Sequence, residues 1–102
     1  GTIGNFSGIE RKKIIKEFLR ISEKVYFDFY PPSRKNLETR KIMYAEEGFK
    51  HLKIVGTKII GYYGFESASI KKQEIASIAR SLGVNLKFHE LCNFVVMAEV
   101  YD

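Results

Sequence analysis

The sequence predicts a single α/β domain in which two helices cover one face of an antiparallel sheet. The chain has 102 residues, of which 45% are apolar, and this is enough for one core and too little for two. Two segments have helical periodicity, and several others have the alternation and composition of strands. The two kinds of segment alternate along the chain, as they do in two-layer α/β folds.

The composition excludes several classes of protein. The apolar share is too high for an intrinsically disordered chain, and no apolar run approaches the roughly 20 residues of a membrane helix. The one cysteine, Cys92, cannot form an internal disulfide or supply a zinc site of several thiolates, and His51 and His89 stand far apart. We therefore expect an intracellular domain, nuclear or cytoplasmic, with no cofactor, no metal and no membrane partner.

The charge balance is basic. Lys and Arg number 17 against 12 Asp and Glu, which gives a formal net charge of +5. A basic excess favours partners that are polyanions, because binding to a phosphate backbone releases condensed counterions. A solvated, lysine-rich surface produces the same excess on many domains, so the charge alone does not identify a partner.

The first third of the chain predicts a strand, a helix and a second strand. Residues 2–6 are short and β-prone. Ser7 and Glu10 have the spacing of a capping box, so a helix should begin at Ser7 and run to about Lys24. Residues 25–30 are β-branched and aromatic, and the two prolines that follow end any strand.

The middle of the chain is less regular. Residues 33–56 form too long a stretch for a bare connection, so we expect structure of its own or a binding loop there. Residues 36–44 fit a short helix and an additional strand equally well. Residues 51–55 alternate charged and apolar side chains, and residues 58–65 resume as a strand, which together predict a hairpin or a bent strand.

The last third predicts a helix and a final strand. Apolar residues recur at helical spacing over residues 75–82, with Ser69 as the expected N-cap and Gly83 as the left-handed end. Residues 84–88 form a short segment, and residues 94–100 have the composition of a strand. The order is βαββαβ, with an elaborated region between the second and third core strands. It predicts the ferredoxin-like sandwich, an antiparallel sheet with two helices on one face.

The same periodicities predict the core. The inward side of the sheet should carry Val25, Phe27 and Phe29. The apolar residues of both helices should pack against it, namely Ile14, Phe18, Leu19, Ile75, Ile78 and Leu82. Tyr26 and Tyr30 should then lie on the opposite, wetter side of the sheet.

Several segments resemble the RNA recognition motif (RRM) family. Residues 2–7 are similar to the first-strand motif of that family, and a predicted helix follows them directly. Residues 62–65, Tyr-Tyr-Gly-Phe, resemble its third-strand motif of glycine and alternating aromatics. Residues 79–86 and 95–98 are similar to its second helix, turn and last strand. The resemblance spans nearly the whole chain and implies one RRM-like domain over residues 1–102.

The resemblance implies that single-stranded RNA lies across the open face of the sheet, with bases stacked on aromatic rings and phosphates held by cations. Tyr63 and Phe65 match the two stacking positions of the third-strand motif, and strand alternation places both on one face. The residues expected to bind RNA are Tyr63, Phe65, Tyr26, Tyr30, Arg34, Lys35, Lys53 and Lys58. The ordinary alternative is that these aromatics are core or half-buried sheet residues and that these cations are solvated.

Other functional classes have less support. The acid and base residues at 46–47 and 89–90 have no partner at a spacing that fixes their geometry, so we expect no enzyme. Residues 56–58 lack the preceding glycine of a phosphate loop. Residues 58–65, the second helix and residues 93–100 are also similar to the first half of a BRCT domain, a phosphopeptide-binding module. The alternative function is therefore a degenerate RRM-like or BRCT-like protein-interaction module, with a protein of an RNA-handling assembly as its partner.

Overall fold

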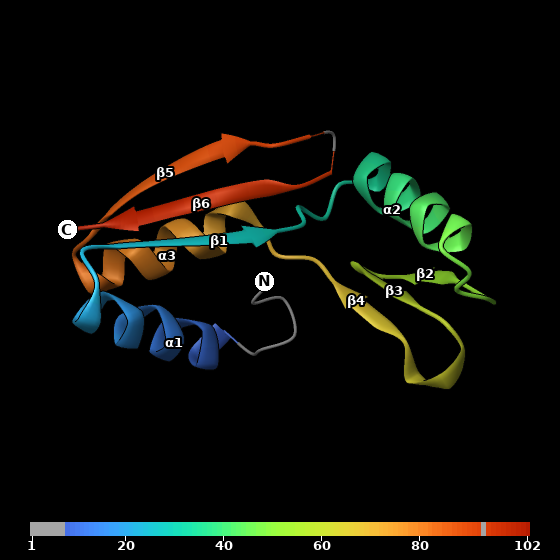
Figure 1. Cartoon of the computed structure of the whole chain (residues 1–102), viewed down its shortest axis with the longest axis horizontal. Coiled ribbons are helices and arrows are strands. Elements are labelled where there is room, and N and C mark those ends of the chain that lie inside the picture. Colours follow the sequence, from blue (N-terminus) through green and yellow to red (C-terminus); the bar gives the residue numbers. More distant parts are fainter. Residues whose placement is uncertain (1–7, 93) are drawn as a thin grey trace.

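The computed structural model describes residues 8–92 and 94–102 (Figure 1). These residues form three α-helices, one short 3-10 turn and six strands, and the strands make two antiparallel sheets. In chain order the elements are α1 (Gly8–Ile21), β1 (Lys24–Phe29), α2 (Arg34–Glu46), β2 (Lys53–Val55), β3 (Lys58–Ile60), η1 (Tyr62–Gly64), β4 (Glu66–Ala68), α3 (Lys72–Leu82), β5 (Asn85–Glu90) and β6 (Val96–Tyr101). The expected first strand and the Ser7 cap lie outside the described residues.

The larger sheet has the strand order β1-β6-β5. Its middle strand is β6, because Ala98 pairs with Phe27 of β1 on one side and with Phe88 of β5 on the other. Residues that pair across strands point to the same face, and the side chains of α1 and α3 pack on that face. Two helices therefore cover one face of an antiparallel sheet, as expected.

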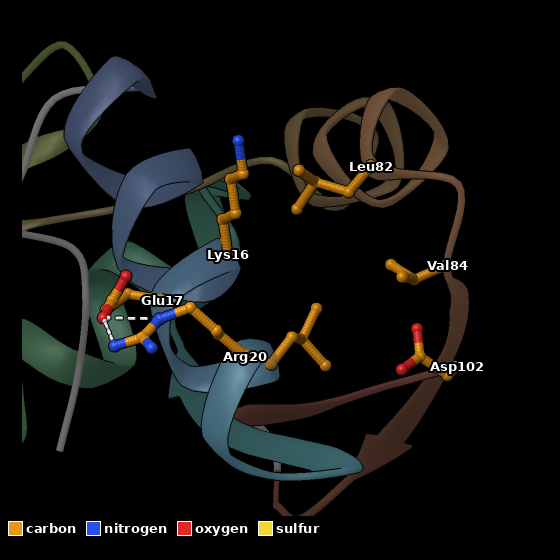
Figure 2. A pocket seen from close by; sticks show the side chains of 7 residues that line it. Lys16, Glu17, Arg20, Leu82, Val84 and Asp102 are labelled. Atoms are coloured by element: carbon orange, nitrogen blue, oxygen red, sulfur yellow. Dashed lines mark hydrogen bonds and ion pairs between the residues drawn. The ribbon is translucent and has the colours of Figure 1, made fainter.

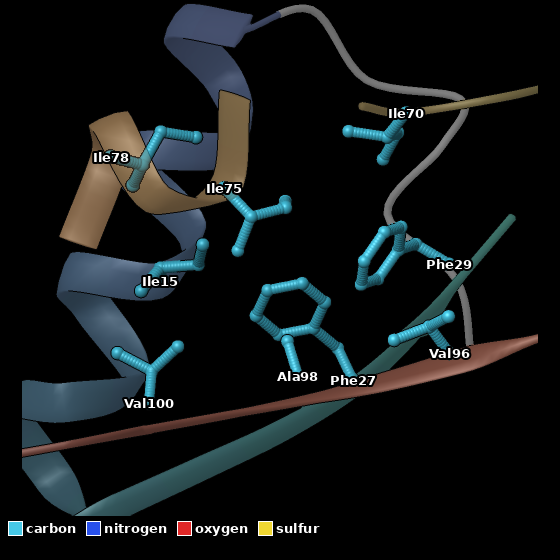
Figure 3. Packing of buried hydrophobic residues seen from close by; sticks show 9 residues of the cluster. All are labelled: Ile15, Phe27, Phe29, Ile70, Ile75, Ile78, Val96, Ala98 and Val100. Carbon is cyan, nitrogen blue, oxygen red and sulfur yellow. The ribbon is translucent and has the colours of Figure 1, made fainter. Parts of the chain in front are cut away.

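The main core lies between this face and the two helices (Figure 3). Phe29 and Ile75 are fully buried, and the Phe29 ring lies 5.8 Å from the Phe88 ring between centroids. The buried cluster consists of Ile15, Phe27, Phe29, Ile70, Ile75, Ile78, Val96, Ala98 and Val100. Full burial of a large apolar side chain contributes about 1.5–3 kcal/mol, so this cluster is a major source of stability.

Helix α1 is rotated relative to the expectation. Its inward row is Arg11, Ile15 and Leu19, which are spaced by four residues and therefore lie on one face. Arg11 forms an ion pair with Glu74 of α3, which fixes this row against the other helix. Phe18 lies outside the row and is 52% exposed, so its predicted place in the core is wrong.

Helix α3 has the predicted periodicity, but only one of its two ends is as expected. Gly83 ends the helix with φ 69°, the left-handed conformation that glycine adopts without strain. Ser69 does not cap the start; the N-cap is Lys71, whose side chain makes no capping bond. The Ser69 hydroxyl instead accepts a hydrogen bond of 2.8 Å from Arg40 Nη1.

Residues 31–69 form an insertion between β1 and α3. The insertion contains α2 and the smaller sheet, whose strand order is β2-β3-β4, and Figure 1 shows it grouped to one side of the larger sheet. The chain leaves and rejoins the core at one point, because the Ile70 amide donates a hydrogen bond of 2.9 Å to the Tyr30 carbonyl oxygen. Every residue of the buried cluster described above lies outside the insertion.

The interior of the insertion contains a buried arginine. Arg40 of α2 is fully buried, and its Nη2 donates a hydrogen bond of 2.9 Å to Ser67 Oγ. Its guanidinium lies over the Tyr30 ring, 4.3 Å from the centroid. Its hydrogen bonds go to serine hydroxyls and a carbonyl rather than to a carboxylate. Burial therefore lowers the pKa of Arg40.

The structure decides between the two assignments left open for residues 36–44. They belong to α2, whose N-cap Ser33 accepts a hydrogen bond of 3.2 Å from the Asn36 amide. The expected hairpin is present as β2 and β3. The strand predicted over residues 58–65 is wrong beyond Ile60, because the chain turns there before β4.

The mixed α/β class is confirmed. The described strands form two sheets of three strands, and the smaller sheet belongs to the insertion. The ferredoxin-like βαββαβ order needs a strand before α1, and residues 2–6 lie outside the described part of the chain. It also needs a core strand between β1 and α3, but the strand expected over residues 58–65 belongs to the smaller sheet, and the described third strand of the larger sheet is β5. This finer arrangement stays a prediction.

Candidate nucleic-acid interface

Three aromatic side chains gather on the surface of the insertion. The rings of His51 and Tyr62 are stacked, with 3.7 Å between their centroids and 17° between their planes. The Tyr63 ring meets the Tyr62 ring edge-on, at 6.1 Å between centroids. Tyr63 is fully exposed and Tyr62 is 53% exposed. We name His51, Tyr62 and Tyr63 the aromatic tip.

Backbone hydrogen bonds hold the aromatic tip in place. The Tyr62 amide donates to the Lys50 carbonyl oxygen at 3.3 Å and joins the two segments that carry the tip. The Gly61 amide donates to the Phe65 carbonyl oxygen at 3.0 Å and closes the loop between β3 and β4. A Cβ atom at Gly61 would lie 3.0 Å from the Leu52 side chain, so this close approach favours glycine.

Two residues of the aromatic tip have a left-handed backbone. The φ angle is 57° at His51 and 59° at Tyr63. This conformation costs a non-glycine residue of order 1–3 kcal/mol, and such residues cluster at functional sites. The fully exposed Tyr63 side chain gains little packing in return. Folding alone therefore does not account for a tyrosine at this position.

Phe65 has a structural role instead. Its ring lies 5.1 Å from the Tyr44 ring and 4.3 Å from the Phe49 ring, between centroids. The prediction that Tyr63 and Phe65 share one face of a strand is wrong, because residues 62–64 form a turn. The packed Phe65 anchors the loop that displays Tyr63.

Lysines flank the aromatic tip. Lys50 lies in the segment before β2, and Lys53 pairs in register with Ile60, the last residue of β3 before the loop. Both lysines are exposed, and within the described part of the chain neither forms an ion pair. Lys58 is the first residue of β3, and its Nζ lies 2.8 Å from Oε1 of Glu66, which pairs in register with Ile60 at the loop end of β3. Both predicted strand lysines therefore lie near the loop end of this sheet: Lys53 forms no ion pair among the described residues, whereas Lys58 is paired with Glu66.

The opposite face of the larger sheet, where the resemblance implies RNA, is a poorer phosphate site. Tyr26 is 54% exposed there, but its register partner is Glu99, and Asp28 follows on the same face. Glu99 Oε1 lies 2.8 Å from His89 Nε2, and its Oε2 lies 3.3 Å from Lys24 Nζ. The bond to His89, together with Lys24, lowers the pKa of the Glu99 carboxyl. The Glu99 carboxylate beside Tyr26 therefore remains charged and repels phosphate.

The remaining predicted residues lie where the insertion meets the core. The Tyr30 ring stacks on the Phe94 ring at 6.3 Å, and burial raises the pKa of the Tyr30 hydroxyl. Arg34 and Lys35 are exposed at the start of α2, and Arg34 Nε lies 2.9 Å from Glu38 Oε1. The structure shows no contact between Tyr30, Arg34 or Lys35 and the aromatic tip.

Sequence reasoning did not assign His51, Tyr62 or Lys50 to the binding site. The available signal was the pair of glycines, Gly61 and Gly64, which bracket the two tyrosines and are typical of a turn. The role of His51 depends on how two separate segments pair, and no local pattern indicates that pairing.

A cavity of about 320 Å³ lies between α1, the end of α3 and the last residue (Figure 2). Leu19, Leu82 and Val84 form its apolar wall. The charged residues that line it are Lys16, Arg20, Glu17 and Asp102. Two cations and two carboxylates balance, so the cavity has no net charge with which to select a charged ligand.

Among the described residues, no helix is long and apolar enough to cross a membrane. The same residues contain no group of three or more His, Cys, Asp or Glu side chains placed to hold a metal ion. No family model matches the chain, and no curated protein is significantly similar to it in sequence. The function is therefore inferred from the geometry of the surface.

Proposed function

We propose that this chain is a non-enzymatic RNA-binding domain that holds single-stranded RNA at the aromatic tip. The observation that carries the proposal is Tyr63, a fully exposed ring at a left-handed backbone position. An exposed ring beside two stacked rings offers a surface for an unpaired base, a contact of about 1–3 kcal/mol per base. The resemblance to RRM domains, in which bases stack on aromatics, supports the same class of ligand.

Lys50 and Lys53 supply the complementary charge. Both residues are exposed, their backbones adjoin the loop that carries the tip, and the chain has a net charge of +5. For a single strand, each neutralised phosphate contributes about −0.7 to the slope of log affinity against log salt concentration. The affinity for RNA should therefore fall as the salt concentration rises.

Fluorescence anisotropy with a labelled single-stranded RNA of mixed sequence tests the role of Tyr63. Tyr63→Ala should weaken binding about 5- to 150-fold, which corresponds to one lost stack. Phe18→Ala is the matched control, because Phe18 is also an exposed aromatic but belongs to α1. The control should keep the wild-type affinity, and both variants should keep the wild-type Tm.

Two double variants that lose the same charge test whether Lys50 and Lys53 contact the RNA. Lys50→Ala with Lys53→Ala should reduce the salt slope by about 1.4, the share of two phosphates. Lys12→Ala with Lys13→Ala removes the same charge from exposed positions of α1 and should change the slope less. Equal effects of the two pairs, or an unchanged affinity of Tyr63→Ala, would contradict binding at the tip. Equal affinity for a DNA strand of the same sequence would contradict RNA as the specific ligand.

A further inference from the structure

A groove runs along one side of α2, next to β2. Its volume is about 370 Å³. The α2 residues that line it recur every three or four positions, so they form one side of the helix, and β2 contributes one residue. The lining residues are Arg34, Glu38, Lys41, Ile42, Ala45 and Ile54, and we name this surface the α2–β2 groove.

The strand beside the groove is an edge strand. Among the residues that the structure describes, the order β2-β3-β4 leaves one side of β2 without a neighbouring strand. Alternate residues of an antiparallel strand direct their N–H and C=O groups to opposite sides, so alternate residues of β2 direct their backbone groups to this edge, where an added strand could pair with them. Ile59 of β3 is fully buried, whereas its register partner Ile54 is only half-buried, because no described strand flanks β2 on its outer side.

The groove and the edge together fit one additional strand. A strand added to β2 would lie about 4.8 Å beyond it, alongside α2. Alternate side chains of that strand would point to the same side of the sheet as Ile54, over Ile42 and Ala45. Ile42 is 61% exposed, so the added strand would bury an apolar side chain that now lies in water.

The charge of the groove selects the kind of strand. Arg34 and Lys41 give the lining two cations against one carboxylate, Glu38, which is paired with Arg34 at 2.9 Å, so the lining has a net positive charge. A second copy of the chain would bring its own net charge of +5 against these cations. We propose that the α2–β2 groove binds an extended acidic segment of another protein, with alternating apolar residues, by strand addition to β2. The aromatic tip takes no part in this binding, which does not depend on the proposed RNA binding.

The first test uses the whole chain and a labelled synthetic peptide of about eight residues that alternates valine and glutamate. In one control peptide lysine replaces glutamate, and in another proline replaces a central valine and removes a backbone donor. We expect both controls to bind at least about tenfold more weakly than the acidic peptide. Amide shifts in NMR spectra should appear on β2 and along the lining side of α2.

The second test changes the groove. Ile42→Asp places a carboxylate at an exposed position of the lining and should weaken binding of the acidic peptide at least about tenfold. Ile21→Asp makes the same change at an exposed isoleucine of α1 and should leave the affinity unchanged. Circular dichroism checks the fold of both variants. Lys41→Glu, a second change in the lining of the groove, should also weaken binding of the acidic peptide. This variant is used instead of Ile42→Asp if Ile42→Asp unfolds.

Several results would overturn the proposal. They are no binding at millimolar peptide, equal binding of the lysine peptide, or an affinity that neither groove variant lowers. Dimerisation that Ile42→Asp abolishes would assign the groove to a second copy of the chain, and displacement of the peptide by single-stranded RNA would assign it to nucleic acid. Tyr63→Ala should leave peptide binding unchanged, so failure of the RNA proposal and failure of this one are distinguishable.

Discussion

At the scale of single residues, Tyr63 has a backbone conformation that favours glycine and a side chain that folding leaves exposed. Its φ of 59° suits glycine, and the left-handed conformation costs other residues of order 1–3 kcal/mol. Its side chain is fully exposed and packs only edge-on against Tyr62. Replacing this side chain should therefore separate binding from folding.

Tyr63→Gly should leave the free energy of unfolding unchanged or raise it by up to about 1 kcal/mol, because the backbone strain is relieved. The same variant should lose RNA affinity as Tyr63→Ala does. Chemical denaturation and RNA titration measure the two effects. Tyr26→Gly is the control: it also replaces an exposed tyrosine, but in the extended strand β1, and should lower stability. A Tyr63→Gly variant destabilised as much as Tyr26→Gly would contradict the strain argument.

The Glu99 carboxyl predicts a pH dependence of stability. Its pKa in the folded chain is lowered by the bond to His89 and by Lys24. Its stabilising contribution is therefore present above the unfolded pKa and is lost as the pH falls through the folded pKa. We expect stability to decrease below about pH 4 and Glu99→Gln to show less of this decrease. Urea denaturation at neutral and acidic pH measures it, with Glu46→Gln as the surface control; identical profiles for all three proteins would contradict the assignment.

At the scale of elements, the sequence predicts best where periodicity and end signals agree. Residues 75–82 have one apolar face and a glycine at the end, and α3 follows that pattern. In α1 the apolar residues fill two adjacent rows, one with Ile15 and Leu19 and one with Ile14 and Phe18, so periodicity does not say which row turns inward. Residues 62–65 have the composition of a strand, but the close approach of Gly61 to Leu52 and the packing of Phe65 impose a turn. Such contacts between separate segments are absent from a local pattern.

The burial of Arg40 also depends on contacts between separate segments and could not be predicted from the local sequence. In the sequence Arg40 resembles its basic neighbours Arg34 and Lys41, which line an open groove. Arg40 is fully buried because Ser67 and Ser69 accept hydrogen bonds from its guanidinium. Ser67 lies in β4, and Ser69 directly follows that strand. For the candidate site, Tyr63 and Lys53 could be predicted from the sequence as candidates, whereas the grouping of His51 with Tyr62 required the structure.

Helix α3 should be the most sensitive helix to truncation of its apolar face. Ile75→Ala should lower the free energy of unfolding by about 2–5 kcal/mol, because Ile75 is fully buried. Leu82→Ala should cost less, since Leu82 is only partly buried at the end of the helix. Phe18→Ala, at the exposed position of α1, should cost less than about 0.5 kcal/mol. Denaturant titrations that reverse this order would contradict the packing of α1 and α3.

At the scale of the whole molecule, the insertion lies beside the core rather than upon it. The chain measures 42 × 25 × 21 Å along its principal axes. The buried cluster contains only residues outside 31–69, and the hydrogen bond between Ile70 and Tyr30 closes the insertion at its base. The larger sheet with α1 and α3 thus supplies stability, and the insertion supplies the aromatic tip and the α2–β2 groove.

Replacement of residues 31–69 by a short glycine-containing turn should therefore leave a folded core. The shortened chain should keep a cooperative thermal transition, although with lower stability, because smaller domains bury a smaller fraction of their surface. It should bind neither the RNA nor the acidic peptide. An unfolded product would show that the core needs the insertion, and retained RNA binding would place the RNA site on the larger sheet.

The most direct test of the central claim is an NMR titration of the intact chain with a single-stranded RNA, which maps amide shifts residue by residue. RNA binding at the aromatic tip predicts shifts concentrated in residues 50–53 and 61–65, with little change on β1, β5 and β6. These shifts should shrink as salt rises. Shifts confined to β1, β5 and β6 around Tyr26, or no shifts at all, would contradict the account.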